Sequence, residues 1–383
     1  MKKLIILLSY IIIFFYSNLF ADQNEKKLKI GLLAPFSGEY SNLGNSIMFS
    51  LQLALDEIDD KDIVIIPGDS GHKNNAKLNK SIQEIIAQGA NIIIGPINSE
   101  DFEQVYKYKE TIFISPSNLD SNIRNNVISI GINLDSQLIA LKDFIKKRNK
   151  KKTVILYPEN KYSSYIESTI KRLDFKHHKL FKYSSDPKIL TGQIEKLSNY
   201  SQRKKNLEFR KKILEEKDDE ASKRELENLE QRYTLGDVNF DSLIVIDFGN
   251  SLKSVLASLV FADVNEKKVT FMTVNQWFDE SIFYENSVKT LYYPSINYKN
   301  FKEYNKKYLR NFNFLPSEIT ILSYEALGLI YYIWKNNEKI LSVKSFLIKN
   351  KIKGKIGTFN FRNNKIIQDL NIYKIENKKF TKI

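Results

Sequence analysis

The stretch that decides the fold runs from residue 28 to residue 58 and reads LKIGLLAPFSGEYSNLGNSIMFSLQLALDEI. Residues 28–34 form a short apolar run, which is typical of a buried parallel strand. Residues 35–44 are rich in small and hydroxyl side chains, and apolar residues then recur at helical spacing from Met48 to Ile58. In an open α/β sheet such a loop lies at the carboxyl end of its strand, where ligands bind near helix N-termini. The stretch therefore predicts a ligand-binding α/β domain.

The N-terminal segment, residues 1–21, has the pattern of a secretory signal. Lys2 and Lys3 precede an apolar stretch at 4–16, and Ala21 precedes a charged run. The apolar stretch is shorter than the roughly 20 residues that a membrane-spanning helix needs, so we expect cleavage after Ala21 and export to the periplasm. An uncleaved membrane anchor is the alternative, because Leu19 is a poor residue at the third position before the cut.

Composition narrows the class of protein. The 383 residues contain no cysteine, which excludes disulfides, zinc–thiolate sites and thiol catalysis. The net charge is +14, but only nine of the 59 basic residues are arginine. Because base recognition and phosphate contacts favour arginine, we do not expect nucleic-acid binding. The length that remains after the signal fits two lobes.

Strand-like and helix-like segments alternate along the chain, and the pattern is used twice. In the first half we expect strands at 28–34, 63–67, 91–94 and 111–115, and helices at 45–59 and about 76–88. In the second half we expect a helix at 134–147, strands at 153–157, 180–184, 243–247, 269–274 and 291–296, helices at 300–312 and 317–335, and a final hairpin around Asn363 and Asn364. This alternation is typical of parallel sheets.

The expected fold class is therefore α/β, with two Rossmann-like lobes whose parallel sheets are joined by a hinge. We assign residues 26–132 and 296–340 to lobe 1, and residues 133–295 and 341–383 to lobe 2. Residues 200–233 differ in character, because they are dense in Lys, Arg, Glu and Gln, with an interruption at 217–219. These are good helix formers, so we expect a charged helical hairpin inserted in lobe 2. It is either a solvated surface insertion or a docking arm.

Polar residues follow several predicted strands and define the candidate ligand site. Hydroxyl groups and backbone N–H groups there are suited to a carboxylate or another anion, with aromatic walls on the opposite side. The predicted ligand-binding residues are Ser37, Gly38, Tyr40, Asn98, Ser99, Ser115 and Ser117 from lobe 1, and Tyr162, Asn250, Gln276 and Trp277 from lobe 2. Each has a structural alternative: a lone serine is often a helix cap, and Trp277 is equally suited to the core.

No motif predicts catalysis, a metal or a cofactor. The three histidines are His72, His177 and His178, and no third ligand accompanies the adjacent pair. The chain lacks the serine-hydrolase elbow, the Walker loop and the dinucleotide fingerprint. We therefore expect a protein that is not an enzyme, although a hydrolase built from two distant carboxylates is a further alternative.

Several of these motifs resemble a known fold. The sequence KIGLLAPFSG at 29–38, the predicted helix at 45–59 and the sequence IGPINS at 94–99 are similar to the type 1 periplasmic binding fold of branched-chain amino-acid binding proteins. The resemblance extends over nearly the whole chain after the signal. It implies two lobes with a ligand cleft and leaves the ligand open.

A narrower resemblance comes from the charged segment and the sequence that follows it. RYTLGDVNFDSLIVIDFG at 232–249 looks like the penicillin-binding-protein activator family. That family implies a non-catalytic docking module that promotes cross-linking by a peptidoglycan synthase through protein contact. This chain departs from the family in having no lipid-accepting cysteine and no additional N-terminal helical-repeat domain.

Two functions are compatible with these observations. The first is an exported, non-catalytic regulator of peptidoglycan synthesis whose partner is a penicillin-binding protein. The alternative is the substrate-binding protein of an ABC importer for amino acids or similar small anions, whose partner is the ABC permease. Against an amino-acid ligand, the bulk of Leu119 and the charge of Asp120 follow Ser117, where such receptors often have a second small hydroxyl residue.

Overall fold

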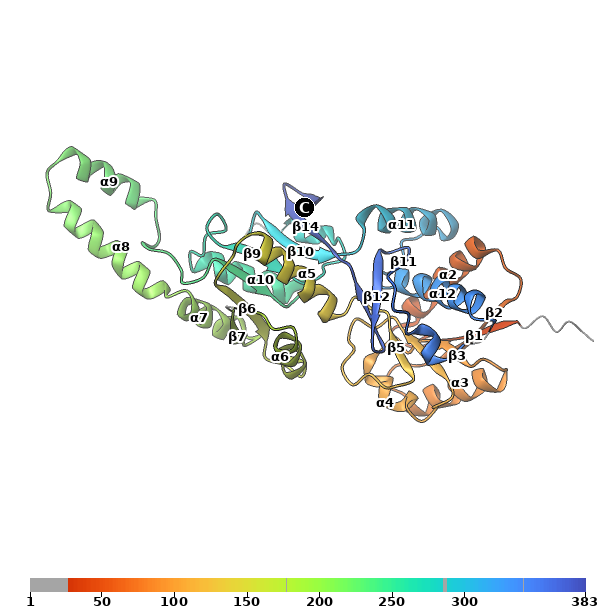
Figure 1. The fold of residues 1–383 in the computed structure, drawn as a ribbon. Helices are drawn as coiled ribbons and strands as arrows, with labels where there is room; N and C mark the ends of the chain where they lie inside the picture. The colour runs from red at the N-terminus through yellow and green to blue at the C-terminus, as the bar shows by residue number, and fades with distance from the viewer. Residues whose placement is uncertain (1–26, 177, 285–287, 340) are drawn as a thin grey trace, which may run out of the picture. The chain divides into compact units, whose positions relative to one another are not determined.

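The computed structural model describes residues 27–176, 178–284, 288–339 and 341–383. The predicted signal at 1–21 and His177 lie outside the described residues. The described chain divides into two compact units (Figure 1). Of the described residues, unit 1 contains 27–116, 124–128 and 323–346, and unit 2 contains 117–123, 129–322 and 347–383. Residues 296–322, expected in lobe 1, group with unit 2, and the lobe boundaries stay a prediction.

The first sheet has eight strands in the order β11-β12-β13-β5-β4-β3-β1-β2. Five of them are β1 (Leu28–Ala34), β2 (Ile63–Asp69), β3 (Ile92–Ile94), β4 (Ile112–Ser115) and β5 (Val127–Ser129). β1 pairs in parallel with β2 and β3, and β3 pairs in parallel with β4. The carboxyl ends of these four strands therefore lie at one edge, as the sequence predicts.

The remaining strands of this sheet come from the C-terminal part of the chain and belong to unit 2. They are β11 (Ile352–Lys353), β12 (Thr358–Arg362) and β13 (Lys365–Gln368). β12 and β13 are antiparallel and form the hairpin expected at residues 363 and 364. β13 pairs in parallel with the last residue of β5, Ser129.

The helices of unit 1 pack close to the sheet. They are α2 (Ser41–Ile58), α3 (Asn75–Ala87), the short η1 (Ser99–Asp101), α4 (Phe102–Val105), η3 (Val343–Phe346) and most of α12 (Thr320–Asn336). α2 packs against β1, and α3 packs against β1 and β2. Gly31 makes this approach possible, because a Cβ there would lie 2.5 Å from the side chain of Ile85 in α3.

The second sheet lies in unit 2 and has seven strands in the order β15-β14-β10-β9-β8-β6-β7. They are β6 (Thr153–Pro158), β7 (His178–Tyr183), β8 (Ser242–Val245), β9 (Thr270–Thr273), β10 (Leu291–Ser295), β14 (Asn371–Glu376) and β15 (Lys379–Lys382). β6, β7, β8 and β9 pair in parallel, and β14 is antiparallel to both β10 and β15.

Five further helices and a short helical turn belong to unit 2. They are α5 (Leu134–Lys147), α6 (Ser163–Arg172), α7 (Pro187–Leu197), α10 (Gly249–Phe261), η2 (Glu280–Tyr284) and α11 (Tyr298–Phe312). Leu138 and Leu141 of α5 and Ile170 of α6 join Ile155 and Ile244 from the strands in one buried apolar cluster. Burial of these side chains is the main driving force for folding of this unit.

Two further helices of unit 2 form a charged pair that projects from the rest of the unit (Figure 1). They are α8 (Tyr200–Glu215) and α9 (Glu220–Glu230), and the chain reverses between them as the sequence predicts. Leu207, Leu214 and Leu229 form a small core between the helices. Arg210 donates to both carboxylate oxygens of Glu225, at 2.8 and 2.7 Å. The α8–α9 pair is therefore stabilised by contacts between its own two helices.

Some elements were not expected. The helices α4, α6, α7 and α10 and the strand β5 are present where the sequence analysis placed loops or nothing. α2 begins at Ser41 rather than at residue 45. Within the described parts of the chain, no helix combines the length and the apolar character needed to cross a membrane.

Candidate functional site

The predicted ligand residues of unit 1 lie at the carboxyl ends of its parallel strands. The loop after β1 is held by Asp69, the last residue of β2. Its Oδ1 accepts hydrogen bonds from the backbone N–H groups of Phe36 and Gly71, both at 2.9 Å. Its Oδ2 lies 2.5 Å from the Lys77 ammonium, which also donates to the Ser37 hydroxyl at 2.7 Å. Ser37 is therefore part of a network that fixes the loop.

The charge of Asp69 is stabilised by this network. Partial burial by itself raises the pKa of the carboxyl group. The hydrogen bonds from Lys77, Ser37 and the backbone N–H groups of Gly71 and Phe36 outweigh that effect and lower the pKa to about 2. Asp69 is therefore ionised at neutral pH and pairs with Lys77. Neither residue was predicted from the sequence to belong to the site.

Gly38, Glu39 and Tyr40 are exposed in this loop, and Gly38 and Tyr40 are the predicted ligand residues among them. Gly38 has a φ of 77°, a left-handed conformation that glycine adopts without strain. The Tyr40 side chain is 40% exposed, and its ring centroid lies 4.6 Å from that of His72. These two predicted residues are available to a ligand from solvent.

An acidic group lies in the same region of unit 1. Burial and the neighbouring charge of Glu100 raise the pKa of Asp101 to about 6, and His72 acts in the opposite direction. Asp101 ends the short helix η1, which follows β3. An acid with such a pKa changes its charge slightly below neutral pH.

The other predicted residues of unit 1 make contacts within the protein. Asn98 caps η1, because its Oδ1 accepts a hydrogen bond from Glu100 N at 3.2 Å. Ser99 is the first residue of η1 and is buried. Ser115 is fully buried, and its hydroxyl donates to the carbonyl oxygen of Pro96 at 2.7 Å. These contacts shape the loops, and a direct role with a ligand stays a prediction.

Ser117 begins a short segment that groups with unit 2, and its hydroxyl accepts a hydrogen bond from Leu119 N at 3.2 Å. Asp120 in the same segment is buried. Its carboxylate accepts from the Tyr165 hydroxyl at 2.5 Å and lies 2.8 Å from the Lys365 ammonium. The charge of Asp120 is thus compensated within the protein. The expectation that Asp120 disfavours an amino-acid ligand loses its electrostatic basis.

The predicted residues of unit 2 fall into two classes. Tyr162 directly precedes α6 and is half-buried, with the Lys161 ammonium 5.1 Å from its ring centroid. Asn250 lies in the first turn of α10 and is exposed. Both follow the carboxyl ends of parallel strands, so their position agrees with a ligand role that stays a prediction.

Gln276 and Trp277 follow β9. The Gln276 side chain is buried, and its amide donates to the carbonyl oxygens of Asp247 and Val274 at 3.1 and 3.0 Å. Gln276 therefore supports the backbone here. Trp277 has a φ of 50°, and its ring centroid lies 6.4 Å from that of Phe301. Trp277 is half-buried.

A polar cluster that the sequence analysis did not select lies at the same edge of unit 2. Asp247 accepts hydrogen bonds from the Tyr183 hydroxyl, from the Ser251 hydroxyl at 2.5 Å and from Phe248 N at 2.8 Å. Tyr183 ends β7, and Asp247 follows β8. Both strands pair in parallel with β6, which lies between them, so their carboxyl ends reach the same edge of the sheet; this was the signal that could have identified the cluster.

Taken by itself, each unit presents a row of polar loops at the carboxyl edge of its parallel strands. Such an edge is where α/β sheets bind small ligands. Among the residues that the structure describes, no three or more His, Asp or Glu side chains are grouped in a way that could hold a metal ion.

Comparisons with known proteins agree with this architecture. Residues 27–173 match a family model described as periplasmic binding protein. A comparison with curated protein sequences gave no significant match.

Three solved structures illustrate the similarity in fold. A periplasmic ligand-binding protein of a branched-chain amino-acid ABC transporter from Burkholderia xenovorans has a TM-score of 0.64 and 10% identity, covering 93% of this chain and 94% of its own. An ABC transporter substrate-binding protein from Desulfitobacterium hafniense, in complex with leucine, has a TM-score of 0.60 and 15% identity, covering 93% and 100%. A solute-binding protein of an ABC transporter from Rhodopseudomonas palustris, in complex with 3,4-dihydroxybenzoic acid, has a TM-score of 0.57 and 14% identity, covering 91% and 92%.

The chain therefore has the type 1 periplasmic binding protein fold, as its motifs predict. The narrower resemblance to penicillin-binding-protein activators is not supported by these comparisons and stays a prediction.

Proposed function

We propose that this protein is an exported, non-catalytic solute-binding protein that delivers a small carboxylate to an ABC permease. The observation that carries the proposal is the type 1 periplasmic binding fold with polar loops at the strand ends of each unit. We prefer this function to regulation of peptidoglycan synthesis, since the three solved structures of similar fold are binding proteins of ABC transporters.

The ligand class follows from the ligands named for two of those structures. Leucine and 3,4-dihydroxybenzoic acid differ in size and polarity, but each carries one carboxylate. Hydroxyl and backbone N–H groups also form strong, charge-assisted hydrogen bonds with a carboxylate. We therefore specify a carboxylate as the group that is recognised. The side chains around it would determine which solute binds.

In unit 1 the proposed contact region is the loop between β1 and α2. α2 has 18 residues and no acidic side chain in its first turn, and its N-terminus carries a partial positive charge. The exposed Glu39 lies two residues before the helix and partly opposes that charge. Gly38 leaves open space, since a Cβ there would meet nothing within 4 Å. Tyr40 offers a ring and a hydroxyl to solvent. Asp69 and Lys77 would act by holding this loop in place.

In unit 2 the proposed contacts are Tyr162, Asn250 and Trp277. Each is at least partly exposed and follows a parallel strand. Gln276 is proposed as a support for the turn that carries Trp277, because its amide is bonded to backbone carbonyls. All four assignments are proposals to be tested by substitution.

A thermal-shift panel tests the function. Leucine, isoleucine, glutamate, benzoate and 3,4-dihydroxybenzoate are compared with leucinamide and benzamide, which lack the carboxylate. A ligand at 100 times its Kd stabilises a protein by about 2.7 kcal/mol, so at least one acid should raise the Tm by several degrees while neither amide does. A flat response across the panel would argue against a carboxylate receptor.

A pair of tyrosine variants locates the site. Tyr40→Ala should weaken binding of the best acid by about tenfold or more, since it removes ring contacts and a hydroxyl group. Tyr332→Ala is the matched control, because Tyr332 is a similarly exposed tyrosine of unit 1 on α12. Equal affinity in both variants would exclude Tyr40 from the site.

A second candidate, regulation of a peptidoglycan synthase by protein contact, is favoured by one observation. The α8–α9 pair has its own core and carries exposed aromatic groups, with Phe209 67% and the following Tyr233 75% exposed. Exposed aromatic side chains on a rigid element are typical of contact surfaces. This function is proposed second, because the fold comparisons do not bear on it.

Crosslinking of intact envelopes followed by purification of this protein tests the second candidate. A penicillin-binding protein should be recovered with the wild type, and its yield should fall with Phe209→Ser. Recovery of an ABC permease without any cell-wall synthase would reject this candidate and support the first.

A further inference from the structure

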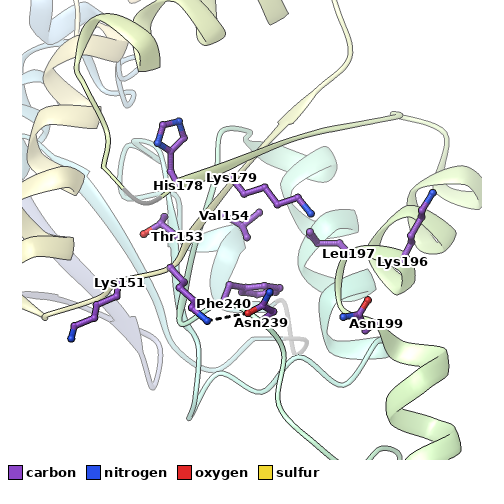
Figure 2. Close-up of a pocket in the computed structure, with 11 residues that line it drawn as sticks. Lys151, Thr153, Val154, His178, Lys179, Lys196, Leu197, Asn199, Asn239 and Phe240 are labelled. Atoms are coloured by element: carbon purple, nitrogen blue, oxygen red, sulfur yellow. Dashed lines mark hydrogen bonds between the residues drawn. The ribbon is translucent and has the colours of Figure 1, made fainter.

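A basic cavity lies in unit 2 at the amino ends of β6 and β7. It has a volume of about 860 Å³. Its lining residues come from the start of these strands, the end of α7 and the loop before β8, and are shown in Figure 2: Lys151, Lys152, Thr153, Val154, His178, Lys179, Lys196, Leu197, Asn199, Asn239 and Phe240. The polar strand-end loops considered above follow the opposite, carboxyl ends of the same strands.

The lysines that line this cavity give it positive charge without an acidic lining residue. Lys151, Lys152, Lys179 and Lys196 line it, and none of its lining residues is Asp or Glu. All four lysines are exposed. In Figure 2, Lys179 extends toward the side formed by Lys196 and Leu197, whereas Lys151 extends away from it. Ammonium groups around one hollow repel each other, and a bound anion removes that repulsion.

Two acidic residues are sequence neighbours of the lining, Glu195 beside Lys196 and Asp241 beside Phe240. Asp241 is bonded to the backbone of the rim. Its two carboxylate oxygens accept hydrogen bonds from the backbone N–H groups of Lys151 and Lys152, at 2.7 and 3.2 Å. The Ser242 hydroxyl also donates to it, at 2.9 Å. Asp241 is thus committed to holding the backbone of the cavity rim.

Neutral residues complete the lining. The Lys152 ammonium donates to Asn239 Oδ1 at 3.1 Å (Figure 2), which fixes one charge at the rim. Asn199 adds an exposed amide side chain. Val154, Leu197 and Phe240 are buried and give the cavity an apolar floor. The lining thus combines several positive charges with apolar surface.

We infer that this cavity binds a small organic anion that carries two or more phosphate groups. Lysine ammonium groups bind phosphate as point charges, and several of them around one hollow match an anion of multiple charge. The volume exceeds what a single phosphate group needs, and the apolar floor accommodates an organic part. The site is separate from the proposed carboxylate site and does not depend on it.

Isothermal titration with ATP, AMP, adenosine and tripolyphosphate tests this inference. The wild type should bind ATP and tripolyphosphate saturably, AMP more weakly and adenosine not at all. Binding should weaken as the salt concentration rises, because exposed charges are screened. Absence of saturable binding of both ATP and tripolyphosphate at millimolar concentration would overturn the inference.

Two triple variants distinguish binding at this cavity from attraction to the overall positive charge of the protein. Lys152→Gln, Lys179→Gln and Lys196→Gln together should weaken ATP binding by at least about tenfold. The control combines Lys146→Gln, Lys171→Gln and Lys188→Gln, which remove the same charge from exposed positions of unit 2 outside the cavity. The control should keep wild-type affinity, and equal weakening in both would overturn the inference. Leucine binding, if present, should be unchanged in both variants, so the two proposals fail independently.

Discussion

Asp69 and its partners hold the loop that the proposed function assigns to the ligand. The carboxylate joins the end of β2 to the backbone of the loop after β1 and to Lys77 on α3. A ligand contact at Gly38 or Tyr40 therefore depends on a residue that need not touch the ligand.

Asp69→Asn should reduce stability at neutral pH. The pKa of Asp69 is about 2 in the folded protein and 3.8 as its ordinary value, so its contribution is present above about pH 4 and is lost as the pH falls toward 2. Linkage puts this contribution at about 2 kcal/mol. Urea unfolding at pH 7 and at pH 2.5 measures it, with Glu39→Gln as an exposed control. An equal loss at both pH values would contradict the role of the charge.

Asp101→Asn should have the opposite effect on stability from Asp69→Asn. The pKa of Asp101 is raised to about 6, first by burial and then by Glu100. The folded state thus binds the proton more tightly than the unfolded state, and stability falls as the pH rises from about 4 through 6. Removal of the acid should raise stability at pH 7.5 by up to about 3 kcal/mol and leave it nearly unchanged at pH 4. Thermal unfolding at both pH values measures this, and a loss at pH 7.5 would contradict it.

At the residue scale, the sequence predicted where polar groups gather but not how each is used. Ser115 and Gln276 were expected to contact a ligand, and in the structure each donates a hydrogen bond to a backbone carbonyl oxygen. The carbonyl that Ser115 contacts belongs to Pro96, on another strand-end loop. Such pairings depend on how strands are placed beside each other, which a single sequence does not specify.

At the scale of elements, α2 shows why helix starts are difficult to predict. The apolar pattern begins at Met48, but the helix begins at Ser41, and its first turns contain Gly44. A Cβ at Gly44 would lie 2.1 Å from the Pro35 carbonyl oxygen. Glycine here permits the close approach of helix and loop, whereas in the sequence it looks like a loop residue.

Gly44→Ala should therefore destabilise the protein by several kcal/mol or prevent folding, because backbone must move to admit the methyl group. The matched control is Gly192→Ala in α7, where a Cβ would meet nothing within 4 Å. The control should increase stability by about 0.5–1 kcal/mol, since alanine favours helix. Similar effects of both substitutions on the Tm would contradict the packing described for Gly44.

The helix α6 was missed for a related reason, because its sequence also looks like a loop. α6 contains only Tyr165, Ile166 and Ile170 as large apolar residues among ten positions, and four of the others are Ser or Thr. In contrast, the charged residues of α8 and α9 favour helix locally, so that pair was predicted.

Arg203 attaches α8 to the rest of unit 2. It is buried, and its guanidinium donates to the carbonyl oxygens of Ser198, Ala262 and Asp263 and to the Thr234 hydroxyl. Arg203→Met should cost about 3 kcal/mol in the free energy of unfolding, since it leaves buried acceptors without donors. Arg224→Met, at an exposed position of α9, should change it by less than about 0.5 kcal/mol. Urea titration of both variants measures these changes. Equal losses in the free energy of unfolding would contradict the anchoring role of Arg203.

At the scale of the whole molecule, the fold was predictable because strands and helices alternate in two series with apolar strands. That pattern specifies parallel sheets and the edge where loops gather. The basic cavity was not predictable, since Lys151, Lys179 and Lys196 come from separate elements and look like solvated charges in the sequence. The identity of the proposed ligand would likewise depend on a few side chains from several loops.

The central claim is that the chain binds one small carboxylate. Native mass spectrometry with the acids of the panel tests it most directly, because it counts bound molecules. We predict one molecule of one of these acids per chain at saturation, lost in Tyr40→Ala and retained in Tyr332→Ala. No bound acid at any concentration, or only unsaturable binding that both variants share, would contradict it.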